Sequence, residues 1–216
     1  MKIFSVRSDP STKWSSDKPL NFSPKPITVF ILCLGLFLFG LGESLIITAS
    51  VGMSPWTVLA EGLSITTGLS IGTLTFLISL GVLLLWIPLK QQAGIGTILN
   101  AIIVAAVIEW SLPYLPHPET YAMQILQAVL GTLIVGVASG IYLIANLGPG
   151  PRDGLMTGCQ KATGLPIAWV RVFLEIVVIT IGWTLGGTVG IATVIFAIGV
   201  GPAVSMGLYL IASISK

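Results

Sequence analysis

Long apolar runs, separated by short polar, glycine-rich or proline-rich segments, make up most of the chain after residue 26. A run of about 20 apolar residues is long enough to cross a bilayer as an α-helix. A membrane β-barrel would instead show short segments of alternating polarity. The pattern therefore predicts an all-α, polytopic transmembrane helix bundle. Its six predicted spans are residues 27–50, 70–89, 94–112, 121–146, 166–185 and 188–212.

Two shorter segments between the predicted spans share one sequence pattern, about 96 residues apart. Each has a proline near its start and a glycine near its end: Pro55 and Gly68 in the first, Pro151 and Gly164 in the second. Proline suits the first helical turn, and glycine suits the left-handed residue past the last turn. Each segment is predicted to be a helix of about 13 residues, roughly 20 Å long. The hydrocarbon core is roughly 30 Å thick, so we expect re-entrant or interfacial helices.

The same offset relates further residues of the two halves, among them Thr67 to Leu69 with Thr163 to Leu165. Each half holds three predicted spans, an odd number, so the second half would enter the membrane from the opposite side. The sequence therefore predicts two inverted three-helix repeats, an arrangement typical of secondary transporters and of some channels. The predicted division is a basic, mobile cytoplasmic tail (residues 1–26), a first repeat (27–112) and a second repeat (121–216).

Basic residues fall on one predicted side of the membrane. With six spans, the tail shares its side with Lys90, Arg152, Lys161 and Lys216, whereas segments 51–69, 113–120 and 186–187 contain no Lys or Arg. Basic residues are enriched in cytoplasmic loops. Both termini are therefore predicted to be cytoplasmic.

Charged residues make up only 8% of the chain, against about 25% in soluble domains. A charge within the bilayer is costly, so each one needs a structural or functional reason. Arg152 follows Pro151 at a predicted helix start, where free N–H groups and the guanidinium both favour an anion. The alternative is a residue anchored at the cytoplasmic head groups. The predicted substrate site comprises the two short-helix starts: Pro55, Trp56, Gly150, Pro151, Arg152 and Asp153.

Three further ionisable residues lie within predicted spans. Arg171 and Glu175 are four residues apart, share a helix face and can form an ion pair. That pair has either a purely structural role or a role in coupling or gating. Glu43 is a candidate proton or cation site, or a partner for Arg152 or Arg171.

Other chemistry finds little support in the sequence. Cys33, Cys159 and His117 lie in separate segments, so no metal site, cofactor or disulfide framework is predicted. No nucleophile–base pair is recognisable, and we therefore expect no enzymatic activity. No nucleic acid partner is expected.

Several motifs resemble one family. These are Gly148 to Leu155 (GPGPRDGL), Met53 to Ser64 (MSPWTVLAEGLS), Val170-Arg171 with Glu175, and Gly186 to Thr193 (GGTVGIAT). Together they resemble the YczE-like bacterial membrane proteins, which are related to YitT-type proteins. The chain departs from that family at Thr57, where an acidic residue is frequent. The resemblance implies a bacterial inner-membrane protein and implies no particular substrate.

Two functional hypotheses follow. The first is a membrane transporter or facilitator of a small anionic or zwitterionic solute, coupled to protons through Glu43 or Glu175. The second is a non-transporting membrane partner or regulator of another protein, which would use the basic tail. A homodimer in the lipid bilayer is compatible with both hypotheses.

Overall fold

The computed structural model describes residues 12–214, and its regular structure over that range is entirely helical. In chain order the helices are α1 (Pro26–Thr48), α2 (Pro55–Thr67), α3 (Ile71–Trp86), α4 (Ile95–Ser111), the 3-10 turn η1 (Leu112–Tyr114), α5 (Tyr121–Ile144), α6 (Pro151–Thr163), α7 (Ile167–Thr184) and α8 (Ile191–Ile214). The predicted all-α bundle is confirmed.

Five helices within the described residues are long and apolar enough to cross a membrane: α1, α4 with η1, α5, α7 and α8. The second predicted span, residues 70–89, is shorter than expected because α3 ends at Trp86 and the chain turns through residues 87–90. Helix α3 has only 16 residues. It is long enough to cross a membrane only when it is counted together with α2, and the two helices are bent by 114° relative to each other. The chain is a multi-pass membrane protein.

The predicted ends of the two short helices are confirmed. Pro55 and Pro151 occupy the first turn of α2 and α6, and both helices have 13 residues. Gly68 and Gly164 adopt left-handed φ angles of 74° and 71°. A side chain at either position would be strained by such a φ, so glycine is the residue that stops each helix there.

A pair of backbone hydrogen bonds also recurs at the repeat offset. The amide of Gly96 donates to the carbonyl of Leu147 at 2.8 Å, and the amide of Ala192 donates to the carbonyl of Val51 at 2.9 Å. Each bond joins the loop before a short helix to the start of the last helix in the other half. The two halves are thus linked reciprocally at equivalent residues.

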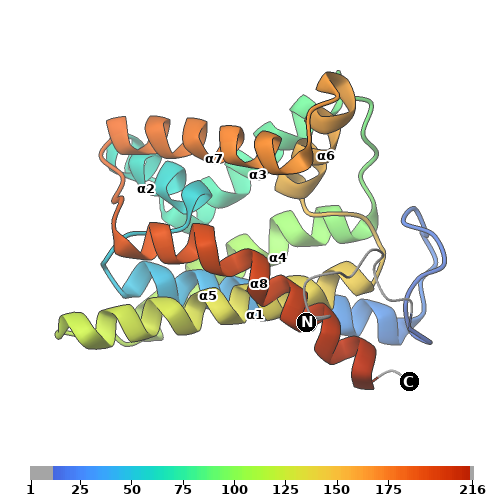
Figure 1. The fold of residues 1–216 in the computed structure, drawn as a ribbon, viewed down its shortest axis with the longest axis horizontal. Coiled ribbons are helices and arrows are strands. Elements are labelled where there is room, and N and C mark those ends of the chain that lie inside the picture. The colour runs from blue at the N-terminus through green and yellow to red at the C-terminus, as the bar shows by residue number, and fades with distance from the viewer. Residues whose placement is uncertain (1–11, 215–216) are drawn as a thin grey trace.

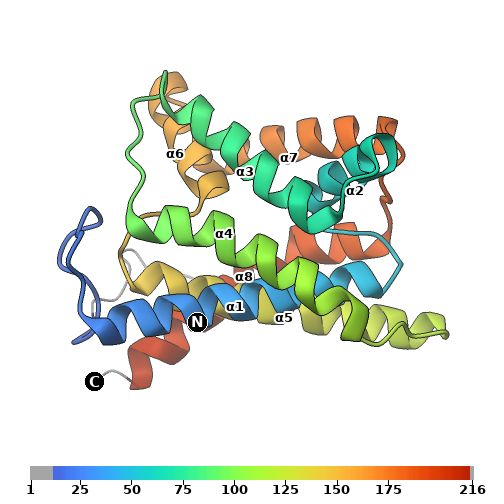
Figure 2. The ribbon, with the colours of Figure 1, turned by 180° about the vertical axis from the view of Figure 1, so that it is seen from behind.

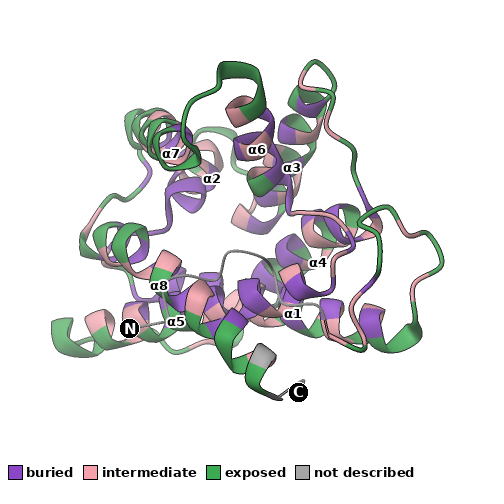
Figure 3. Ribbon diagram, turned by 45° about the vertical axis from the view of Figure 1, so that its right-hand side comes forward, coloured by how far each residue is buried: buried purple, intermediate pink, exposed green. Residues whose placement is uncertain are grey.

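The helices form two layers (Figure 1). Helices α1, α4, α5 and α8 pack together in one layer, and α2, α3, α6 and α7 pack together in the other. The first and last helices of each half therefore lie in one layer, and the two middle helices of each half lie in the other. Figure 3 shows the two layers obliquely, coloured by the burial of each residue.

The layers are joined on one side and separated on the other. Helix α3 packs against α4, which closes the side seen in Figure 2. Helix α7, the repeat counterpart of α3, packs on α2 and α6 and makes no comparable contact with α8. Accordingly, only 17% of the residues in the most apolar stretch of α7 and 22% of those in α8 are buried, against 50% for α1 and α5.

The part of the predicted tail that the structure describes, residues 12–25, contacts the bundle. The amide of Ser16 donates to the carbonyl of Ala145 at 3.1 Å, and Asn146 Nδ2 donates to the carbonyl of Ser16 at 2.8 Å. Trp14 packs against the core formed by α1, α4 and α5. Residues 1–11, which carry the rest of the predicted tail, lie outside the described residues.

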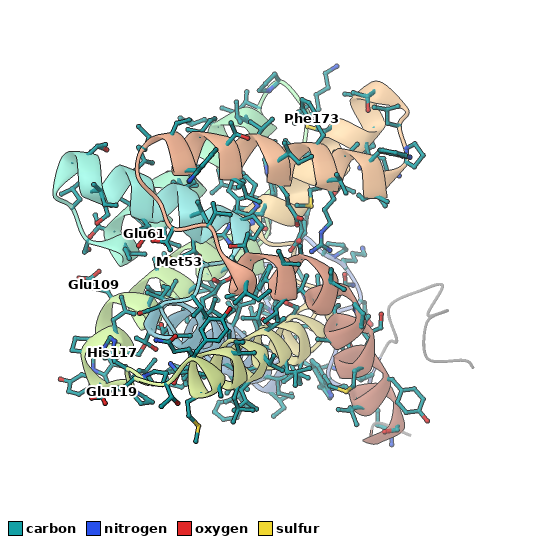
Figure 4. All side chains as sticks on the ribbon, turned by 60° about the vertical axis from the view of Figure 1, so that its left-hand side comes forward. Met53, Glu61, Glu109, His117, Glu119 and Phe173 are labelled. Carbon is teal, nitrogen blue, oxygen red and sulfur yellow. The ribbon has the colours of Figure 1, made fainter. Side chains whose placement is uncertain are left out.

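Acidic side chains gather at the end of the bundle opposite to this segment. Glu61, Glu109 and Glu119, together with the basic residue His117, lie near one edge of the view in Figure 4. Glu61 accepts hydrogen bonds from the backbone amide and the hydroxyl of Thr188 in the α7–α8 loop.

Candidate functional site

A cavity of about 370 Å³ lies between the two layers. Small-molecule sites commonly have volumes of about 300–1,000 Å³. Helices α1 to α8 all contribute to its wall. Most of the predicted site residues line it: Trp56, Gly150, Pro151, Arg152, Asp153, Arg171 and Glu175. Pro55 and Glu43 are buried behind the wall and do not line the cavity.

The starts of the two short helices meet in this wall. The Cζ atom of Arg152, in the first turn of α6, lies 5.3 Å from the centre of the Trp56 ring, in the first turn of α2. A guanidinium at that distance makes a favourable cation–π contact. Between residues 12 and 214, Arg152 forms no salt bridge and no hydrogen bond through its guanidinium. Its charge and its five N–H donors are therefore available to a ligand.

Trp86 of α3 holds the start of α6 in place. Its indole Nε1 donates to the carbonyl of Pro151 at 3.0 Å. Its ring covers Gly154, where an added Cβ would lie 1.9 Å from Cζ2 of the indole. Thr97 of α4 donates a second hydrogen bond, to the carbonyl of Pro149 at 2.7 Å. Both donors come from the first half of the chain, which thus fixes the position of Arg152.

Glu43 of α1 is 1% exposed and lies beside the start of α2. Its Oε2 accepts hydrogen bonds from Ser54 Oγ at 2.8 Å and from Thr57 Oγ1 at 3.0 Å. Its charge also attracts Arg152. No salt bridge joins Glu43 to Arg152 within the described residues, and the hydrogen bonds of Glu43 go to hydroxyl groups that the sequence analysis did not connect with it.

The second half has a related contact with the roles exchanged. The hydroxyl of Tyr142 on α5 hydrogen-bonds to Oδ2 of Asp153 in the first turn of α6. Asp153 occupies the repeat position of Thr57. In each half a carboxylate and a hydroxyl thus tie a long helix to the start of a short one. The acid stands on the long helix in the first half and on the short helix in the second.

Arg171 and Glu175 form the ion pair that their spacing predicts. Arg171 Nε lies 2.9 Å from Glu175 Oε1, and the two side chains are 37% and 14% exposed. Both side chains line the cavity on the α7 side. This pair and Arg152 are therefore placed on different parts of one cavity wall.

Several cavity residues were not predicted as site residues. Tyr142 is a single phenol within an apolar span, and its position near the end of that span was the only signal. Thr75 and Ser79 of α3 are the repeat counterparts of Arg171 and Glu175, and all four line the cavity. Apolar residues of α8, namely Phe196, Val200 and Val204, complete the wall, and their pattern is that of any buried span.

Three buried polar atoms have no hydrogen-bond partner within the described part of the chain. They are Glu43 Oε1, Trp56 Nε1 and Thr75 Oγ1. Leaving a buried polar group unpaired costs about 1–3 kcal/mol. Trp56 and Thr75 both line the cavity, at 6% and 2% exposure. Both unpaired atoms therefore belong to residues of the cavity wall that Arg152 shares.

Replacing Tyr142 with phenylalanine is expected to lower the free energy of unfolding by about 1 kcal/mol, because the Asp153 carboxylate loses a buried donor. Thermal unfolding of the purified protein would measure this change. Tyr209→Phe on the exposed surface of α8 is the matched control, since Tyr209 is 52% exposed. Equal stability of the two variants would contradict a structural role for the Tyr142–Asp153 contact.

No group of three or more His, Cys, Asp or Glu side chains within residues 12–214 is arranged to hold a metal ion. Cys33 and Cys159 are both free thiols. The uncommitted polar groups around the cavity include a guanidinium, an indole N–H and a hydroxyl, all of which can donate to an anion.

Comparisons with known proteins identify relatives of this chain in two bacteria. A Haemophilus influenzae protein, described as uncharacterized, is 40% identical over 207 residues, which cover 96% of this chain and 94% of the relative. The uncharacterized membrane protein YczE of Bacillus subtilis is 32% identical over 76% of this chain and 77% of its own length. The B. subtilis protein YyaS is 25% identical over 75% of this chain and 83% of its own length.

No solved structure matches the chain. The resemblance to YczE-like proteins, which the sequence motifs indicated, is confirmed by these relatives. The model of a family of unknown function, DUF6198, matches residues 27–207, which include every residue that lines the cavity. The chain is therefore a member of the DUF6198 family of multi-pass membrane proteins.

Proposed function

We propose that this protein is a transporter or facilitator of a small anionic or zwitterionic solute, rather than an enzyme. The observation that carries the proposal is the meeting of the α2 and α6 starts at the cavity, with Arg152 free of any salt bridge in the described residues. Helix starts offer free N–H groups and partial positive charge to an anion.

The proposal includes two inverted repeats in a bacterial inner membrane, with both termini cytoplasmic. The equal lengths of α2 and α6 support it, as do the paired bonds Gly96–Leu147 and Ala192–Val51. In such transporters the substrate binds where short or broken helices of the two repeats approach each other. The end with Glu61, Glu109 and Glu119 in Figure 4 is then the outer end, and the absence of Lys and Arg from segments 51–69, 113–120 and 186–187 agrees with the positive-inside rule.

Proton coupling would involve Glu43 or Glu175. Glu43 is buried with one oxygen unpaired, and Glu175 is held by Arg171 at the cavity. A solute that displaces Arg171 from Glu175, or Ser54 or Thr57 from Glu43, would change the free-energy cost of keeping that carboxylate charged. Substituting each acid by glutamine and measuring flux with and without a proton gradient would identify the coupling residue.

The test is thermal unfolding of the purified full chain against inorganic phosphate, short-chain carboxylates, zwitterionic amino acids, cations and neutral sugars. A ligand that binds only the folded state stabilises it by about 2.7 kcal/mol at a hundred times its dissociation constant. We expect an anion or a zwitterion to stabilise the protein. Its affinity should fall at least about tenfold in Arg152→Gln, which corresponds to about 1.4 kcal/mol.

Lys161→Gln is the matched control, because Lys161 lies in the last turn of the same helix and does not line the cavity. A solute that binds should next be tested for uptake into proteoliposomes. Stabilisation by cations alone, or by no solute, would contradict the proposal and favour the protein-partner hypothesis.

A further inference from the structure

The wall of the cavity is least tightly packed between α7 and α8. Residues of both helices line it, yet the two helices make no comparable contact with each other. They are joined only at one end, through the loop at residues 185–190. The corresponding seam in the first half, between α3 and α4, is packed. In a bilayer the α7–α8 seam faces lipid, because the outer surface of α7 carries Trp169 and Phe173, which are 68% and 66% exposed.

The wall of the cavity changes in character from one side to the other. Arg152, Trp56 and Thr75 supply polar groups on the α2, α3 and α6 side. On the α8 side the wall is formed by Phe196, Val200 and Val204, and on the α7 side it carries Arg171 and Glu175, whose charges are paired with each other. A ligand matched to both sides would therefore have one anionic head and an apolar chain.

The unpaired donors specify the head group. Trp56 Nε1 is a pure donor, the Thr75 hydroxyl can donate, and the Arg152 guanidinium is cationic. Carboxylate and phosphate oxygens accept bonds from all three groups. The other charged groups around the cavity are three acids, Glu43, Asp153 and Glu175, and one base, Arg171. Glu175 is paired with Arg171. Glu43 and Asp153 attract the charge of Arg152.

We propose that the cavity binds an amphiphilic anion, whose head group contacts Arg152, Trp56 and Thr75 and whose apolar chain leaves toward the bilayer between α7 and α8. This inference rests on the proposed anion site and narrows its substrate class. A carboxylate on an acyl chain and a phosphate on a single-chain lipid share the required chemistry. A water-soluble anion would need no apolar wall and no loosely packed seam facing lipid.

The experiment uses the full chain in phosphatidylcholine nanodiscs with a photoactivatable dodecanoic acid that carries a terminal diazirine. Cross-linked residues are located by mass spectrometry. We expect cross-links on the cavity face of α8, at Phe196, Val200 and Val204. Phe173, which points away from the bundle in Figure 4, serves as the marker of labelling from bulk lipid.

Competitors then separate the parts of the ligand. Decanoate should remove the α8 cross-links, whereas acetate, which has no chain, and decanol, which has no charge, should not. Decyltrimethylammonium should also fail to compete. Lysophosphatidic acid with a ten-carbon chain tests the phosphate head: stronger competition than decanoate would indicate a lipid-derived ligand, and weaker competition would indicate a free fatty acid.

Three variants test the head-group contacts. Each variant should raise the decanoate concentration that is needed for half-maximal competition. The expected increase is at least tenfold for Arg152→Gln and severalfold for Trp56→Phe and Thr75→Val. Trp183→Phe is the matched control for Trp56→Phe, since Trp183 is 65% exposed on α7. Thr75→Val keeps the shape of its side chain, so it tests the contact if Arg152→Gln does not fold.

The possible failures are distinguishable. If acetate competes as well as decanoate, the anion site stands and the amphiphile is wrong. If decanol or decyltrimethylammonium competes as well as decanoate, the head-group assignment is wrong. If labelling occurs at Phe173 and not on α8, the probe reaches the protein only from bulk lipid, and the inference is overturned.

Discussion

Replacing Glu43 with leucine is expected to lower the free energy of unfolding by about 3 kcal/mol, because Glu43 accepts from two buried hydroxyl groups and leaving a buried polar group unpaired costs about 1–3 kcal/mol. Ser54 and Thr57 would lose the oxygen that accepts both of their hydroxyl hydrogen bonds. Arg152 would lose the attraction of the Glu43 carboxylate. The start of α2 would then be held less firmly against α1.

Glu43→Gln separates geometry from charge. The glutamine carbonyl oxygen can still accept from Ser54 and Thr57, so this variant should retain most of the stability that Glu43→Leu loses. Thermal and denaturant unfolding of both variants beside the wild type would measure the difference. A leucine variant as stable as the wild type would refute the structural role of Glu43.

Replacing Gly182 with leucine is expected to destabilise the protein by about 3 kcal/mol, the upper end of the usual cost of overpacking. Helix α7 packs on α2 at this glycine. An added Cβ would lie 2.5 Å from the carbonyl oxygen of Val58 and 2.6 Å from the Cα of Leu59. Both neighbours are backbone atoms, so the clash can be relieved only by moving one helix away from the other.

The control is Gly81→Leu on α3, where an added Cβ would meet nothing within 4 Å. Leucine has the higher helix propensity, so this variant should unfold at or above the wild-type temperature. Equal unfolding temperatures of the two variants would contradict tight packing of α7 on α2. Loss of solute binding in Gly182→Leu alone would further indicate that the position of α7 shapes the cavity.

Local sequence features predicted the helices well, since the signals that end a helix are local. Proline in the first turn and glycine in the left-handed position fixed the ends of α2 and α6. The span at residues 70–89 was predicted too long because apolar residues continue past Trp86, where α3 ends. Hydropathy does not register where the backbone turns.

The site was only partly predictable. Arg152 and Asp153 were identified because charges near apolar spans are rare, and the Arg171–Glu175 pair was predicted from helical spacing. The partners of Glu43 were missed, since Ser54 and Thr57 lie across a loop and reach it only when α2 folds back on α1. Tyr142 was missed because a single phenol in an apolar span has no periodic signature.

By itself, the sequence determined the membrane class, the helix ends, the duplicated short helices and the rare charges, because composition, periodicity and turn residues act locally. Only the tertiary structure decided which starts meet, that Glu43 lies against the start of α2, and that α3 packs on α4 while α7 and α8 make no comparable contact. The physical reason is that lipid chains and protein cores are equally apolar. A hydrophobic helix face therefore gives the same pattern whether it meets lipid, another helix or a ligand.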